Sequence, residues 1–169
     1  MKRGFTLVEL LVAMAIVSLL STFVVFKYVE NDQVKHLKNQ AELIIDGLEK
    51  TQNMALTGQT TSDRTPLAYR FQLAECTTDC SYQIVAVFAA DGQDEEVVEN
   101  KNFGQALITT NTGQPLLATF NLPRGRLSLN DNQADSAWAQ IANEDSFFCV
   151  KVIAVSGRLD LLSGECTNL

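Results

Sequence analysis

Apolar residues fill the first part of this 169-residue chain and become periodic further on. Positions 5–26 are mostly apolar, and their single charged residue is Glu9. As a helix, residues 5–28 measure about 36 Å, enough to cross the roughly 30 Å hydrocarbon core of a bilayer. Because Lys2 and Arg3 precede them, the positive-inside rule keeps the N-terminus cytoplasmic and sends the following residues across. The pattern predicts a transmembrane helix over 5–28.

A three- and four-residue spacing of apolar positions follows directly, as is typical of an amphipathic helix. No proline interrupts the pattern, and Gly58 is a suitable helix stop. We therefore expect one continuous helix over 5–57, amphipathic over 29–57, with fraying or a bend at Asn31 and Asp32, which are poor helix formers. The apolar positions that share the spacing are Val34, Leu37, Ala41, Ile44, Ile45 and Leu48.

After a linker at 59–66 the period changes to two, which predicts strands. Alternation runs through 69–73, and 81–89 is rich in β-branched and aromatic residues. The three-residue loop between Cys76 and Cys80 sets these cysteines opposite each other, within disulfide reach. In this register the face expected to meet the helix carries Tyr69, Phe71, Leu73, Val85 and Val87.

Turn residues separate the remaining apolar stretches. Short stretches at 106–109, 117–122 and 126–129 predict further antiparallel strands. Residues 130–146 are polar and irregular, with room for a short helix around Trp138.

The chain ends in a predicted hairpin, in which 147–155 pairs with 158–162 through a two-residue turn. Cys149 then lies opposite Gly164, and Cys166 lies two residues further along on the same face. Diagonal neighbours are slightly too far apart for a disulfide, so the bond requires a bend near Gly164, which glycine permits. The predicted fold class is α+β, a long helix packed on an antiparallel sheet.

The cysteines and the charge limit the chemistry. An even number of cysteines after the apolar segment indicates disulfides in an oxidising compartment, and we expect Cys76–Cys80 and Cys149–Cys166. A zinc site is disfavoured, because there is one close cysteine pair and one histidine, His36. The net charge of −7 argues against a nucleic-acid partner.

A family resemblance explains the position of Glu9. The processing site of type IV prepilins and type II secretion pseudopilins resembles Gly4-Phe5-Thr6-Leu7-Val8-Glu9-Leu10. The resemblance implies cleavage after Gly4 by a prepilin peptidase and methylation of Phe5, the new N-terminus. It also implies that Glu9 acts in assembly, by pairing with the Phe5 ammonium of a neighbouring subunit inside the fibre.

The same resemblance implies a domain order and a set of partners. Residues 1–4 are then a leader peptide, 5–57 the assembly helix and 58–169 a periplasmic β-sheet head domain. The partners are other pilin or pseudopilin subunits, the prepilin peptidase and the inner-membrane assembly platform. The protein is then a single-pass inner-membrane protein that later enters a pilus or pseudopilus, with no enzymatic activity, cofactor or metal.

A second resemblance involves two turns, in the segments 120–126 and 153–159, followed by Cys166. These segments are similar to the two Gly-Arg strand turns of the GspH/FimT group of minor pilins and pseudopilins. That group supplies low-abundance subunits near the fibre tip, so the likeness implies a minor subunit.

Other interpretations remain open at this point. Glu9 can snorkel to the cytoplasmic interface without any role in assembly. An unprocessed single-pass protein with a periplasmic enzyme or binding domain fits the same hydropathy, although His36 has no nucleophile at helical spacing. Acidic stretches at 91–96 and 130–135 offer oxygen ligands for calcium but lack an EF-hand spacing. A DNA-uptake minor pilin requires a basic C-terminal turn, and here Asp160 follows Arg158 closely.

Overall fold

The computed structural model divides the chain into two compact units, Met1–His36 and Leu37–Leu169, and each is considered by itself. Gly4 and Phe5, the expected cleavage and methylation positions, lie outside the described residues. For 22–31 the description covers the backbone only. The described residues are 7–90, 92–104, 106–111, 113–130, 134–143 and 146–166.

The one α-helix of the described residues, α1, runs from Leu7 to Thr57. Helical structure continues through Asn31 and Asp32, so the fraying expected there is wrong. The helix ends where the sequence predicts, because Gly58 takes a left-handed φ of 62° and the Gln59 amide donates to the Met54 carbonyl at 3.2 Å. This arrangement satisfies carbonyls at the helix end that would otherwise lack donors. Among the described residues, no helical stretch is both long and apolar enough to span a membrane.

In the second unit the helix buries one continuous stripe. Its positions recur every three or four residues, as expected for a helix with one face in the core. Val34 belongs to the predicted stripe but lies in the first unit with 36% of its surface exposed, and Ile45 is half-buried. The buried positions are Leu37, Gln40, Ala41, Ile44, Gly47, Leu48, Thr51, Met54 and Ala55.

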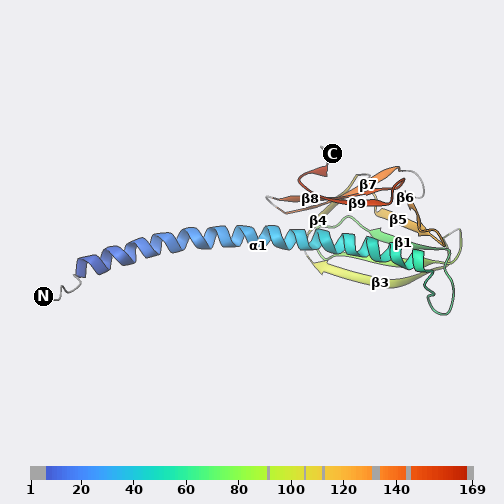
Figure 1. The fold of residues 1–169 in the computed structure, drawn as a ribbon, viewed down its shortest axis with the longest axis horizontal. Helices are drawn as coiled ribbons and strands as arrows, with labels where there is room; N and C mark the ends of the chain where they lie inside the picture. The colour runs from blue at the N-terminus through green and yellow to red at the C-terminus, as the bar shows by residue number, and fades with distance from the viewer. Residues whose placement is uncertain are drawn as a thin grey trace. The chain divides into compact units, whose positions relative to one another are not determined.

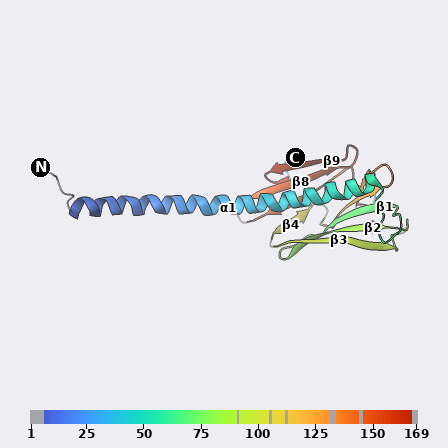
Figure 2. The same ribbon diagram turned by 60° about the horizontal axis from the view of Figure 1, so that its bottom comes forward.

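The strands of the second unit form two antiparallel sheets (Figures 1 and 2). The five-stranded sheet has the order β3-β2-β1-β5-β6, and the four-stranded sheet has the order β4-β7-β8-β9. The fold class is therefore α+β, as predicted. The strand bounds are β1 Ala68–Leu73, β2 Cys80–Val87, β3 Glu95–Gly104, β4 Leu107–Thr110, β5 Leu116–Asn121, β6 Arg126–Leu129, β7 Ser136–Ala142, β8 Phe147–Ile153 and β9 Arg158–Ser163.

The predicted register of the first hairpin is wrong by one residue. Pairing between β1 and β2 ends at Leu73 and Tyr82, so Cys76 does not lie opposite Cys80. Instead Cys76 exchanges two backbone hydrogen bonds with Ile108, of 3.3 and 2.8 Å. This bridge to the strand region of the other sheet draws the loop away from the hairpin. The cross-strand partners of Tyr69, Phe71 and Leu73 are therefore Ala86, Ile84 and Tyr82, in place of the expected Val87 and Val85.

Two strands were not predicted. The acidic stretch that ends at Glu96 leads into β3, an edge strand whose exposed positions are mostly polar. The short helix expected around Trp138 is wrong, because Trp138 lies in β7, between β4 and β8. Ala137, Ala139 and Ile141 form the buried face of β7.

The C-terminal hairpin exists, but its register differs by two residues. Ile153 pairs with Arg158, so the turn has four residues, and Cys149 pairs with Leu162. The bend expected at Gly164 is present, with a φ of 120°. It brings Cys166 back to Cys149 although the two are further out of register than predicted.

Candidate functional site

Between Leu7 and Ser21 the helix of the first unit is apolar on all sides, apart from Glu9, Ser18 and Ser21. The described side chains from Leu7 to Ser21 are all exposed, including Leu7 at 78% and Leu19 at 67%. An amphipathic surface helix keeps a polar face for water, whereas a helix apolar all round belongs in lipid or among other helices. This surface requires a partner or a membrane.

The polar groups of this segment are arranged for apolar surroundings. The Ser18 hydroxyl donates to the Met14 carbonyl at 2.9 Å, and the Ser21 hydroxyl donates to the Val17 carbonyl at 2.8 Å. Both hydroxyls are thus satisfied within the helix and need no water. Glu9 is the acidic residue of the first helical turn, where the positive end of the helix dipole favours a carboxylate.

In the second unit the helix packs closely on the five-stranded sheet at Gly47. A Cβ atom placed on Gly47 would lie 2.8 Å from Cε2 of Phe71 and 2.8 Å from Cζ of Tyr82. The two rings are in contact, with centroids 5.0 Å apart and planes tilted by 34°. Burial raises the pKa of the Tyr82 hydroxyl above 10.0, with nearby Glu99 and Asp46 adding to the shift. The glycine therefore sets the distance between helix and sheet.

Long-range hydrogen bonds hold the surrounding segments to this core. Gln40 donates from Nε2 to the Phe103 carbonyl at 3.1 Å, which ties the helix to β3. The Tyr69 hydroxyl lies 2.8 Å from the Gln59 carbonyl and 2.9 Å from the Thr61 hydroxyl, which anchors the loop after the helix.

Two acidic stretches were considered for calcium, and in the first of them, 91–96, carboxylates form ion pairs with arginines. Asp94 accepts from Arg64 at 2.8 Å, and Glu95 accepts from Arg70 at 2.6 Å. The Arg64 guanidinium also lies 3.9 Å from the centroid of the Phe88 ring. Within the described residues no group of acidic, histidine or cysteine side chains is placed to hold a metal, although 91 and 131–133 lie outside that set.

The structure contains the two disulfides that the sequence analysis expected. Cys76 and Cys80 are joined with Cα atoms 5.6 Å apart, and Cys149 and Cys166 with Cα atoms 5.3 Å apart. His36, the remaining candidate for catalysis, is exposed on the helix beside Lys35.

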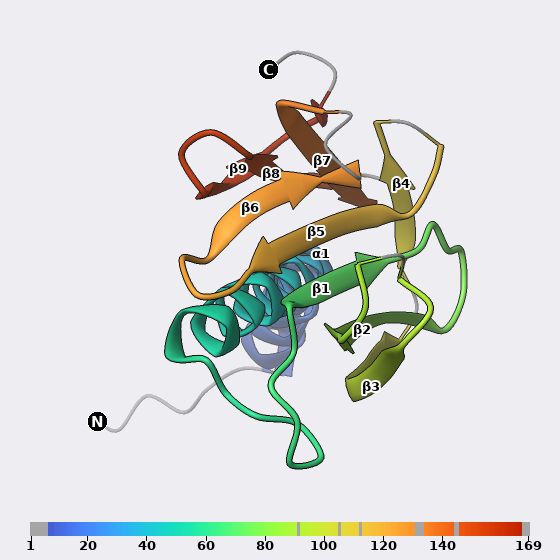
Figure 3. The same ribbon diagram turned by 90° about the vertical axis from the view of Figure 1, so that its right-hand side faces the viewer.

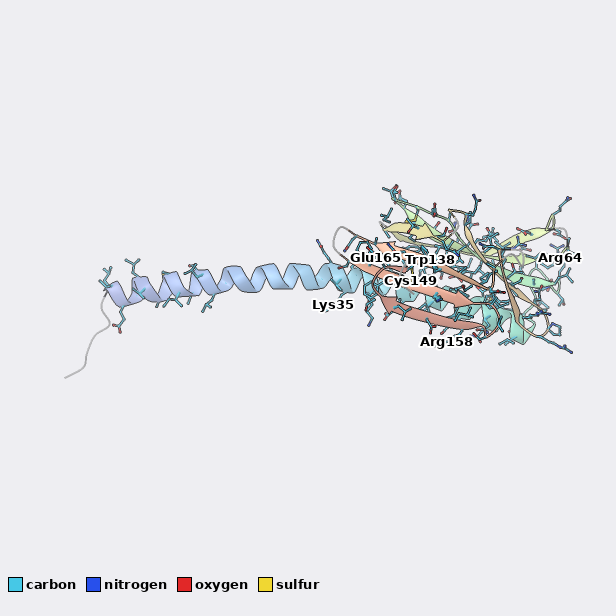
Figure 4. All side chains as sticks on the ribbon, turned by 90° about the horizontal axis from the view of Figure 1, so that it is seen from above. Lys35, Arg64, Trp138, Cys149, Arg158 and Glu165 are labelled. Atoms are coloured by element: carbon cyan, nitrogen blue, oxygen red, sulfur yellow. A yellow bond between two sulfur atoms is a disulfide. The ribbon has the colours of Figure 1, made fainter. Side chains whose placement is uncertain are left out.

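Arg124, Arg126 and Arg158 lie at two turns that both approach the end of the helix. A Cβ atom on Gly125 would lie 2.7 Å from Leu56, and one on Gly157 would lie 3.5 Å from Gln52. Arg158 is paired with Asp160 at 2.7 Å and stands well apart from Arg64 (Figure 4). Among the described residues, neither Arg124 nor Arg126 forms an ion pair. The sequence could not have revealed these relations, since each depends on contacts between distant segments.

Comparison with known proteins identifies the beginning of the chain. Residues 1–25 match the family model of the prokaryotic N-terminal methylation motif. No curated protein and no solved structure matches the chain. The match covers the all-apolar helix, its first-turn carboxylate Glu9 and the positions expected for cleavage and methylation, Gly4 and Phe5. This chain therefore carries, at residues 1–25, the N-terminal signature of type IV prepilins.

Proposed function

We propose that this protein is a structural subunit of a type IV pilus or a type II secretion pseudopilus. A prepilin peptidase removes residues 1–4 and methylates Phe5. The chain is then held in the inner membrane, with residues 5–28 in the bilayer and residues 58–169 in the periplasm. It assembles into the fibre by packing of its helix, residues 5–57, against the helices of other subunits. The observation that carries the proposal is the methylation motif on a helix whose described side chains from 7 to 21 are exposed and, apart from Glu9, Ser18 and Ser21, apolar.

The second unit supports a non-catalytic role. Buried Gln40 bonds the helix to β3, the Arg64–Asp94 pair joins the loop after the helix to the segment before β3, and the four cysteines are all in disulfides. The two Gly-Arg turns favour a minor subunit, and we include this in the proposal. Partners are other pilin or pseudopilin subunits and the assembly platform of the inner membrane.

Glu9 has a defined part in the proposed mechanism. In the fibre core its carboxylate neutralises the ammonium of Phe5 on the adjacent subunit, and the pair sets the axial register of the helices. Two opposite charges that meet in an apolar environment offset much of the desolvation cost that each would bear alone. Snorkelling of Glu9 to the interface is the competing account.

A comparison of Glu9→Leu with Glu9→Asp tests the mechanism in the native host. Glu9→Leu should reach the membrane at normal abundance and should still be cleaved after Gly4, because a charge has left the bilayer. Its co-purification with the other fibre subunits should fall at least tenfold, while Glu9→Asp retains more of it. Normal assembly of Glu9→Leu would refute the pairing and support snorkelling.

A further inference from the structure

The outer edge of β6, which no strand of the described residues covers, borders a cleft that the proposed assembly helix does not use. β6 is the last strand of the five-stranded sheet, and all four of its residues line a cavity of about 300 Å³. Figure 3 shows β6 between β5 and the hairpin formed by β8 and β9. The opposite wall of the cavity consists of Ala134, Asp135, Ala154 and Val155.

The backbone at this edge can accept another strand. An edge strand turns alternate N–H and C=O groups away from its neighbour, and an added strand can bond to them. The end of β6 is already occupied, because Leu129 forms an isolated bridge with Ala134, so an added strand would meet the edge at 126–128. Two alanines on the facing wall leave room for the side chains of an incoming segment, and a cavity of this size lies within the range of ligand sites.

Charge indicates what kind of segment would bind. Three of the described arginines, Arg64, Arg70 and Arg158, are paired with carboxylates, but the ion pairs of the described part include no partner for Arg124 or Arg126. Arg126 lines the cleft, and Arg124 lies two residues before it in the preceding turn. On a chain of net charge −7, these two arginines outnumber the carboxylate of the cleft, Asp135, and this local excess of positive charge favours an acidic partner.

Exposed apolar groups accompany the arginines. Val155, in the wall of the cleft, exposes 87% of its surface, and Leu56, which contacts the turn at Gly125, exposes 52%. A binding site for an extended peptide combines such apolar contacts with hydrogen bonds along a strand edge. A strand edge offers backbone hydrogen bonds to another polypeptide, and the cleft adds apolar contacts, so the observations favour a polypeptide over a nucleic acid.

We propose that the β6 edge binds an extended acidic segment of a partner protein by strand addition, with Arg124 and Arg126 holding its carboxylates. The segment carries β-branched residues that pack against Val155. This surface is independent of N-terminal processing and of the assembly helix, so it can be tested whether or not the proposed function is correct.

A random peptide library displayed on phage and selected on the full chain in detergent tests the proposal. Selected peptides should be rich in Asp or Glu next to Val, Ile or Thr. Arg126→Gln should weaken binding of the best synthetic peptide about tenfold, the loss expected for one charge-assisted hydrogen bond. Lys101→Gln removes the same charge from β3, the opposite edge of the sheet, and should change nothing.

Two further probes separate strand addition from simple charge attraction. Methylation of alternate backbone amides of the peptide should abolish binding in one of the two alternating patterns only, since one set of amides faces β6. The proposal is overturned if the library yields no peptide or if the selected peptides lack acidic residues. It is also overturned if Arg126→Gln and Lys101→Gln bind the best peptide with equal affinity. It is also overturned if a short DNA duplex binds at Arg126 more tightly than every selected peptide.

Discussion

Replacement of Gly47 by alanine should destabilise the protein, although the same change on an exposed helix face would stabilise it. The added methyl group would lie 2.8 Å from atoms of Phe71 and Tyr82, well inside van der Waals contact. Phe71 is fully buried and Tyr82 is 4% exposed, so neither ring can swing into solvent. The helix must therefore move away from the sheet, or the rings must leave their packed positions.

The expected magnitude follows from two opposing effects. Alanine is favoured over glycine within a helix by about 1 kcal/mol. Overpacking of a buried contact costs about 1 to 3 kcal/mol, and a contact this close belongs in the upper part of that range. The net loss of unfolding free energy should be about 1 to 2 kcal/mol, which lowers Tm by about 3 to 6 °C for a domain of this size.

Urea and thermal unfolding of the full chain in detergent, with both disulfides intact, measure this loss. Asn39→Ala, on the exposed face of the same helix, is the matched control and should be neutral or slightly stabilising. In a Tyr82→Leu background, Gly47→Ala should lose most of its cost, with a coupling energy of about 1 kcal/mol. The reasoning is refuted if Gly47→Ala stabilises the protein as much as Asn39→Ala does.

Two other predictions concern the second unit. Loss of the Cys149–Cys166 bond by double serine substitution should lower the free energy of unfolding by about 3 kcal/mol, given the separation of 17 residues. Loss of the Cys76–Cys80 bond should lower it less, because these cysteines are 4 residues apart. Non-reducing peptide mapping that joins Cys76 to Cys149 would contradict both pairings. Because the pKa of Tyr82 is raised in the folded state, the folded protein holds this proton more tightly, so stability should fall as the pH rises above about 10. Tyr82→Phe should reduce that fall in Tm measured between about pH 9 and 11, and an unchanged pH dependence would contradict burial of the hydroxyl.

The helix could be predicted from the sequence because its signals are local. Apolar spacing marked the stripe from Leu37 to Leu48, and Gly58 marked the stop, where the left-handed φ is found. The methylation motif at the start of the chain is equally local, and the roles proposed for Gly4, Phe5 and Glu9 follow from it without any knowledge of the fold.

The sheets were harder to predict because their pairing is not local. The bridge between Cys76 and Ile108 shifts the first hairpin, and nothing in the hairpin sequence signals this partner. The sequence of β7 predicts an irregular segment, because alanine, a weak strand former, occupies the buried positions 137 and 139. β3 lacks a regular apolar alternation, since it is an edge strand with polar exposed positions.

The contact at Gly47 and the cleft along β6 could not be predicted either, because both depend on pairing between segments distant in the sequence. The close approach of Gly47 to Phe71 and Tyr82 depends on the register between β1 and β2, and the sequence predicts that register with an error of one residue. The cleft along β6 combines residues from three segments, and only the folded chain shows that Arg126 and Val155 line one cavity.

The intact mass of the protein purified from membranes of its native host tests the central claim most directly. The proposed function predicts the mass of residues 5–169 with one added methyl group at Phe5, after allowance for two disulfides. A Gly4 variant with a bulky side chain, expressed beside it, should keep the mass of the uncut chain. A wild-type mass that retains Met1 to Gly4 would contradict prepilin processing and favour an unprocessed single-pass protein.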